Sequence, residues 1–184
     1  MVASTRTQIR VDFGGAGKDG AWLTVNLDGD GKAHNTPDIV ADITAAARQL
    51  GQHFAPNSID EAQCIATLEH LPPWDVVETL RYWRGFMKYG AALTITVPDM
   101  PAIFAGYAEG RYGAEVLAGM LYGPKAWQQK TPYEAHRWGW DYSSLEALLH
   151  EAGFWDVQRV VEPEPGFFVE DHRVAMLAVR ALAI

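Results

Sequence analysis

The chain has one cysteine, no long hydrophobic run and no cluster of basic residues. Its single cysteine, Cys64, lies in the apolar segment 62–66 and has no partner for an internal disulfide. We therefore interpret it as a small core residue and expect a reducing, cytoplasmic environment. No signal-peptide pattern opens the chain, and no apolar run approaches the length of a bilayer span. The sequence thus predicts no membrane partner.

Positive charge is scarce as well. The chain has 15 lysine and arginine residues and 23 aspartate and glutamate residues, which gives a formal charge of -8. An acidic protein repels phosphate backbones, and the basic residues are scattered, so we expect no nucleic-acid partner. We find no internal repeat and no low-complexity tract, and 184 residues suit a single domain over 1–184. No pattern indicates the oligomeric state.

Short apolar runs alternate with helical stretches from Gln8 to about Val161, which predicts an α/β fold with a mostly parallel sheet. Prolines and a glycine in segment 162–166 favour a turn, so the last two strands should pair antiparallel. The sheet is then seven-stranded with a reversed last strand, and helices are expected on both of its faces. The expected strands are 8–13, 23–27, 38–41, 61–66, 92–97, 156–161 and 173–180, and the expected helices are 44–52, 73–88 and 143–152.

Two regions carry more local detail. The helix over 143–152 has the spacing of a capping box at Ser143 and Glu146, and Gly153 can end it in the left-handed conformation. Residues 100–142 do not follow the alternation of strands and helices. They contain two short helical patterns and then a loop rich in tryptophan and tyrosine. We interpret this segment as an insertion on the ligand side of the sheet.

The first expected strand runs directly into a glycine-rich segment, residues 14–20 (GGAGKDG). Glycines at this place let backbone N–H groups approach a ligand, and nucleotides bind beyond the first strand of doubly wound sheets. A flexible turn explains the glycines alone equally well. Only about nine residues separate the first two strands, whereas a parallel crossover normally needs about a dozen or more. The first crossover is therefore predicted to be shortened, with its helix missing or reduced to one turn.

The second expected strand ends in polar residues. Adenosine-binding folds place a hydrogen-bond acceptor there for the ribose hydroxyls, so Asn26 and Asp28 are candidates. A calcium loop is rejected because Lys32 and Ala33 occupy positions that need an oxygen ligand and a glycine. A plain acidic turn remains the alternative.

Several segments, in the correct order and covering most of the chain, resemble class I S-adenosylmethionine-dependent methyltransferases, especially small bacterial and phage members. The segment 58–72 is the most specific, since it is similar to a family signature around the fourth strand that ends in LEHLP. The resembling segments are 11–17 (VDFGGAG), 37–44 (PDIVADIT), 58–72 (SIDEAQCIATLEHLP), 87–99 (MKYGAALTITVPD) and 136–154, which begins HRWGWD.

The resemblance implies a Rossmann-like sheet, S-adenosylmethionine as the cofactor and methyl transfer to a small-molecule acceptor. Asp42 would accept a hydrogen bond from the adenine amino group, and Ile43 would cover the ring. Family association suggests a sugar or a polysaccharide-precursor hydroxyl as the acceptor, with residues 100–142 as an acceptor-side lid. The implied cofactor-binding residues are Asp12, Gly14, Ala16, Gly17, Asn26, Asp28, Asp42, Ile43, Thr67, Leu68, Glu69 and His70.

The chain departs from the family pattern at three places. Ala16 stands within the glycine core, Asn26 stands where the ribose-binding acid is usual, and residues 88–91 (KYGA) replace a Pro-Gly-Gly turn. The departures leave a second interpretation, a catalytically inactive binding or scaffold protein with the methyltransferase fold. A nicotinamide-dependent oxidoreductase is disfavoured by the short first crossover and by the Leu68-Glu69-His70 segment.

His70 and His136 are the candidate catalytic residues, since a hydroxyl or ammonium acceptor needs a base near neutral pH. A structural role beside Glu69 and a solvated loop position are their alternatives. The six histidines show no H-x-x-x-H spacing, so the sequence predicts no metal site. Aromatic residues in or next to the 100–142 segment either line an acceptor pocket or seal the lid. They are Trp127, Tyr133, Trp138, Trp140 and Tyr142.

Overall fold

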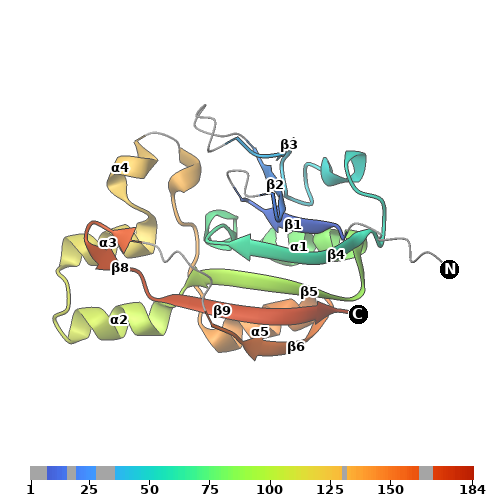
Figure 1. Cartoon of the computed structure of the whole chain (residues 1–184). Helices are drawn as coiled ribbons and strands as arrows, with labels where there is room; N and C mark the ends of the chain where they lie inside the picture. Colours follow the sequence, from blue (N-terminus) through green and yellow to red (C-terminus); the bar gives the residue numbers. More distant parts are fainter. Residues whose placement is uncertain (1–7, 16–19, 28–35, 130–131, 162–167) are drawn as a thin grey trace.

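A computed structural model describes residues 8–15, 20–27, 36–129, 132–161 and 168–184, which form a seven-stranded sheet in the order β3-β2-β1-β4-β5-β9-β6 (Figure 1). The last strand, β9, pairs antiparallel with both neighbours, and the other strands run parallel to one another. This confirms the Rossmann-like fold with a reversed last strand. The strands are β1 Arg10–Phe13, β2 Leu23–Asn26, β3 Ile39–Val40, β4 Ile59–Ile65, β5 Met87–Pro98, β6 Phe154–Arg159 and β9 Met176–Ala183.

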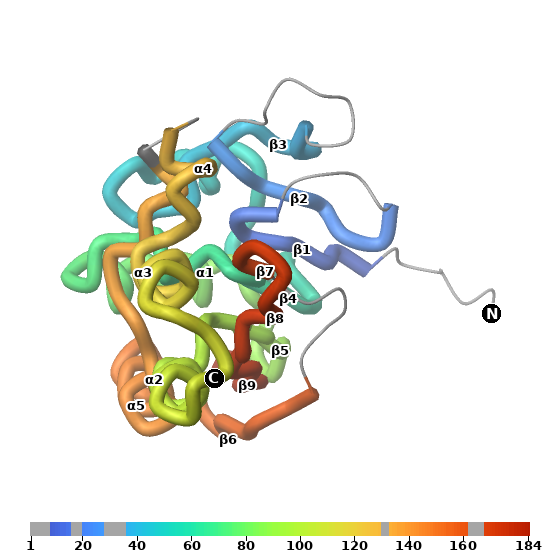
Figure 2. The backbone as a smooth tube through the Cα atoms, turned by 90° about the vertical axis from the view of Figure 1, so that its left-hand side faces the viewer, coloured from blue at the N-terminus to red at the C-terminus, as the bar shows by residue number. Residues whose placement is uncertain are grey.

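The helices fall into two groups. Two of them, α1 (Val76–Phe86) and α5 (Tyr142–Glu151), lie on one face of the sheet (Figure 2). The others gather beyond the carboxyl ends of the parallel strands, together with a small second sheet (Figure 1). They are α2 Met100–Ala108, α3 Ala114–Tyr122 and α4 Lys125–Gln128, and the small sheet pairs β7 Phe168–Val169 with β8 His172–Arg173. None of the described helices combines the length and the hydrophobicity that a bilayer-spanning segment needs.

The main core lies between the sheet and the helices α1 and α5. Phe13 of β1 stacks on Trp83 of α1 with ring centroids 4.4 Å apart, and both side chains are fully buried. The Trp83 Nε1 donates to the Ile43 carbonyl over 2.7 Å, so the indole also has its polar partner. A second, smaller apolar cluster joins α2 and α3 to the 168–176 region through Ile103, Met120 and Val169. The segment 100–122 therefore has its own packing.

The opposite face of the sheet is polar. Arg10 pairs with Glu61 over 3.0 Å and lies 4.0 Å from the centre of the Trp22 ring, while Gln63 donates to Asp12. Among the described residues no helix packs on this face, so the predicted cover of helices on both faces is found on one face only. The connection from β1 to β2 spans only residues 14–22, which is too short for a full crossover helix and agrees with the predicted shortening.

The prediction of a helix over residues 44–52 is wrong. The chain forms a turn there, followed only by the short 3-10 helix η2 (Leu50–Gln52). Asp42 accepts from the Thr44 N–H, and the Gln49 side chain accepts from the Asp42 N–H, each over 2.8 Å. Arg48 has a φ of 52°, which a helix does not permit. Side chains thus satisfy the backbone in place of a helical ladder.

The predicted position of helix α5 is confirmed. So is its end at Gly153, which has a φ of 89°. Its capping box differs from the prediction. Asp141, not Ser143, is the N-cap, and its carboxylate accepts from the Ser144 N–H over 2.8 Å while the Ser144 Oγ accepts from the Asp141 N–H. The helix begins two residues earlier than the S-x-x-E pattern indicated, because Asp141 caps the N–H of Ser144.

We predict that Asp141→Ala lowers the melting temperature by a few degrees, because α5 loses its cap. The hydrogen bonds from Ser144 hold the pKa of Asp141 below its usual value of 3.8. The contribution of the carboxylate is therefore present at neutral pH and is lost as the pH falls through that lowered pKa. Thermal unfolding at pH 7 and pH 3 checks both points, with Asp141→Asn as the variant that keeps an accepting oxygen. Equal melting temperatures for Asp141→Ala and the unchanged chain at pH 7 would contradict the cap.

Candidate functional site

The carboxyl ends of β1, β2 and β3 are tied together by direct hydrogen bonds. Gly14, directly after β1, donates its N–H to the Val25 carbonyl over 2.7 Å. Its own carbonyl accepts from the Asn26 Nδ2 over 2.9 Å, and the Asn26 carbonyl accepts from the Ala41 N–H over 2.9 Å. The three strand tips therefore form one edge, where ligands bind in open α/β sheets.

Thr67, after β4, completes this edge by packing on the glycine turn. Gly14 has a φ of 87°, and a Cβ placed there would lie 2.2 Å from the Thr67 Cγ2 and 2.3 Å from its Oγ1. Only glycine fits both the backbone and the contact. Ala66, just before Thr67, has a φ of 46°, which is uncommon for a residue with a side chain. The chain thus turns sharply at the end of β4 to bring Thr67 onto Gly14.

The side chain of Asn26 stabilises this edge through hydrogen bonds to the backbone. Besides its bond to Gly14, its Oδ1 accepts from the Leu27 N–H over 2.8 Å. A primary amide has two donor hydrogens and two acceptor lone pairs, so each polar atom retains capacity for one more hydrogen bond. The half-buried Asn26 therefore supports the glycine turn and can still bond a hydroxyl group.

The other predicted cofactor residues are placed as follows. Asp12 is half-buried on β1 and accepts from Gln63, and Asp42 is half-buried just beyond β3. Ile43 is only 6% exposed and belongs to the core, as does the fully buried Leu68, so neither presents an open apolar surface. Ala16, Gly17 and Asp28 lie outside the described residues.

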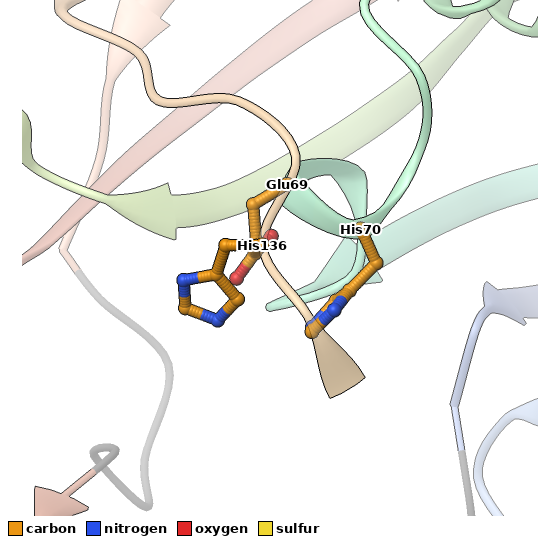
Figure 3. A group of neighbouring side chains, drawn as sticks. All are labelled: Glu69, His70 and His136. Carbon is orange, nitrogen blue, oxygen red and sulfur yellow. The ribbon is translucent and has the colours of Figure 1, made fainter. Parts of the chain in front are cut away.

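The short 3-10 helix η3 (Leu68–His70) leads from Thr67 to a cluster of titratable side chains, Glu69, His70 and His136 (Figure 3). The rings of His70 and His136 meet edge to face with centroids 4.9 Å apart. His136 comes from the loop before α5. The backbone N–H groups of Arg137 and Trp138 donate to the Glu69 carbonyl over 2.7 and 3.3 Å, so this loop is fixed against η3.

Burial controls the charges of the cluster. Glu69 is 1% exposed, and desolvation raises its pKa to about 8. Desolvation, and then the nearby charge of His70, lowers the pKa of His136 to about 4. The pKa of His70 is lowered as well, chiefly by desolvation. Both imidazoles are therefore neutral near pH 7, each with one nitrogen lone pair that can accept a proton or bind a cation.

An open pocket of about 260 Å³ adjoins this cluster, with His136 in its wall. Of the aromatic residues that the sequence indicated, Trp138 lines the pocket, whereas Trp140 is 4% exposed and belongs to the core. Most residues of the pocket wall were not predicted from the sequence, because the helical patterns in 100–122 did not indicate which of their residues face the pocket. The lining residues are Met100, Phe104, Leu121, Tyr122, His136, Arg137, Trp138 and Gly139.

We predict that Gly14→Ala lowers the free energy of unfolding by about 1–3 kcal/mol, because the added methyl group both strains the backbone and meets Thr67. Gly85→Ala is the matched control, since a Cβ there meets nothing within 4 Å and the residue lies inside α1. It should stabilise the chain by up to about 1 kcal/mol. Urea unfolding distinguishes them, and equal midpoints would contradict the described turn.

No protein-family model and no curated protein sequence matches this chain. Solved structures do match it in shape. A S-adenosylmethionine-dependent methyltransferase from Archaeoglobus fulgidus aligns with a TM-score of 0.60 at 13% identity, over 95% of this chain and 86% of that one. The methyltransferase SibL aligns with a TM-score of 0.55 at 17% identity, over 97% of this chain and 51% of that one.

The CurJ carbon methyltransferase aligns with a TM-score of 0.56 at 13% identity, over 98% of this chain and 49% of that one. The chain therefore spans about half the length of the CurJ and SibL chains. At such low identities the likeness concerns the fold alone. It shows that the chain has the fold of the S-adenosylmethionine-dependent methyltransferases, as the sequence segments predicted.

Proposed function

We propose that the chain is a S-adenosylmethionine-dependent methyltransferase with a small-molecule acceptor. One observation carries the proposal. The segment Thr67–His70 packs at one end on the glycine turn after β1 and at the other end places His70 against His136, which lines the pocket. A cofactor site at the strand tips and an acceptor site are thereby joined through four consecutive residues.

The residues at the strand tips fit an adenosyl group. The turn at Gly14 carries no side chain of its own, Asn26 keeps hydrogen-bonding capacity for a ribose hydroxyl, and Asp42 stands beyond β3 with its Oδ1 held by the Thr44 N–H. Asp12 and Thr67 flank the turn. Ile43 and Leu68 support this edge from the core.

When bound, S-adenosylmethionine supplies an electrophilic methyl group on a positively charged sulfur. The protein then has to align an acceptor atom with that methyl group, exclude water and take up a proton. The pocket between α2, α3 and residues 136–139 is the proposed acceptor site, and the 100–142 segment is its lid. Its apolar and aromatic wall, with Arg137 as the charged group, suits a ring-shaped acceptor such as a sugar or a polysaccharide precursor.

His136 is the proposed base, with His70 beside it. The Nδ1 of His136 lies 3.1 Å from the Met120 carbonyl, so it carries the hydrogen and donates, and Nε2 keeps the lone pair. The lowered pKa keeps this lone pair available at neutral pH. It also makes the imidazole a weak base, so proton uptake from a hydroxyl must accompany methyl transfer, not precede it.

The second candidate is a scaffold protein that retains the fold without turnover. The observation that favours it is the engagement of both polar atoms of Asn26 in bonds to the chain itself. Such a residue offers a ribose only uncharged hydrogen bonds, at a place where a carboxylate would offer stronger, charged ones.

S-adenosylhomocysteine should bind with one-to-one stoichiometry in calorimetry and raise the melting temperature, because a ligand that binds only the folded chain stabilises it. Asp42→Ala should weaken this binding about tenfold or more, the loss of a charged hydrogen bond. Asp171→Ala, an exposed residue in the β7–β8 turn, should leave it unchanged. The absence of any binding at millimolar ligand would contradict the proposed cofactor site.

Transfer of a radiolabelled methyl group to a panel of hydroxyl-bearing sugars and sugar nucleotides tests turnover. His136→Ala should lower kcat by about a hundredfold while the affinity for S-adenosylhomocysteine stays the same, since the imidazole acts on the acceptor. His150→Ala, at an exposed residue of α5 whose ring stacks on Trp155, is the control with full activity. Cofactor binding without transfer to any acceptor would favour the scaffold.

A further inference from the structure

The cluster of Glu69, His70 and His136 contains more titratable side chains than the uptake of one proton requires. Proton uptake needs one imidazole, yet the structure brings two imidazoles and a buried carboxyl group to one place (Figure 3). Glu69 has no part in the methyl transfer described above.

The spacing of the three side chains fits a common cation. One ligand atom from each residue lies within 4.8 Å of the others. Ligand atoms at about 2.1 Å from an ion lie at most about 4.2 Å apart, so small side-chain rotations bring all three into coordination distance. The residues come from two segments that backbone hydrogen bonds hold together, which keeps this spacing fixed.

Two buried polar atoms of the cluster have no hydrogen-bond partner in the described part of the chain. Glu69 Oε2 and His70 Nδ1 are buried and accept or donate no hydrogen bond among the residues that the structure describes. Glu69 is 1% exposed, and a buried oxygen is costly to leave without a partner. A bound ion would displace the carboxyl proton to solvent and satisfy this oxygen.

The third ligand is already oriented. The hydrogen bond from His136 Nδ1 to the Met120 carbonyl fixes the ring and directs Nε2 as the coordinating atom. Metal-binding histidines commonly use their second nitrogen in this way.

We propose that Glu69, His70 and His136 bind a divalent first-row transition-metal ion through one carboxylate and two imidazoles. Imidazole ligands suit Zn²⁺ or Co²⁺, whereas Mg²⁺ and Ca²⁺ prefer oxygen ligands alone. Three protein ligands leave at least one coordination position open, and His136 places the ion at the pocket wall. This replaces the expectation from histidine spacing that the chain has no metal site.

The role of the ion rests on the proposed function. An acceptor hydroxyl in the open position would have a lowered pKa, as metal-bound water does, and would release its proton to solvent water before its oxygen attacks the methyl group. Coordinated imidazoles have no lone pair left for a proton, so the ion and the free imidazole are alternative ways to activate the acceptor. Metal binding itself can be measured whether or not methyl transfer occurs.

The experiment uses the full chain without a histidine tag, freed of metal with a chelator. Calorimetry with Zn²⁺ should give one site per chain, Co²⁺ should give visible absorption bands of a four- or five-coordinate site, and Mg²⁺ should give no heat. Glu69→Gln and His136→Ala should each weaken Zn²⁺ binding at least tenfold. His53→Ala, an exposed histidine outside the cluster, should bind as the unchanged chain does.

Circular dichroism of each variant checks that it remains folded, and Glu69→Gln is chosen because a neutral amide of similar shape suits the buried position. The proposal would be overturned if the unchanged chain did not bind Zn²⁺, or if Glu69→Gln and His136→Ala bound Zn²⁺ as tightly as the unchanged chain. Since S-adenosylhomocysteine binding is measured separately on the same preparations, a missing metal site and a missing cofactor site give different results.

Discussion

The close approach of Thr67 to Gly14 is the contact on which the proposed site depends. Thr67 follows the turn at the end of β4, and Gly14 follows β1, the adjacent strand. Because no side chain stands at Gly14, the start of η3 packs directly on the backbone of the turn. The position of η3 is thereby set relative to the strand tips, and with it the position of His70.

The same short helix determines the second half of the site. The Glu69 carbonyl accepts hydrogen bonds from two backbone N–H groups of the loop that carries His136, so this loop is joined directly to η3. Buried polar groups joined in this way have few alternative arrangements. The strand tips, the histidine pair and the pocket wall thus form one continuous unit, although their residues are far apart in the sequence. This unit is what a methyl donor and an acceptor, held in line, would require.

The sequence predicted the sheet well, because alternating apolar runs and turn residues depend on local patterns. The positions of α5, of Gly153 and of the reversed strand followed from such patterns. The prediction of a helix over 44–52 was wrong because the side chains of Asp42 and Gln49 accept hydrogen bonds from backbone N–H groups. Such bonds compete with helix formation, and helix propensity alone does not predict them.

The site was predictable only in part. Motif resemblance indicated Gly14, Asn26, Asp42 and Thr67, and the structure places them at one edge. The meeting of Glu69 and His70 with His136 was not predictable, since it depends on how the 100–142 segment folds back onto η3. The pocket wall from α2 and α3 has the same origin. Contacts between distant segments leave no periodic signal in the sequence.

The decisive measurement is a crystal structure of the chain soaked with S-adenosylhomocysteine. We expect the ligand at the strand tips, with its amino-acid end at the Gly14 turn, its adenosine toward Asn26 and Asp42, and its sulfur facing His70 and His136. A ligand found elsewhere on the chain, or a sulfur directed away from the histidine pair, would contradict this expectation.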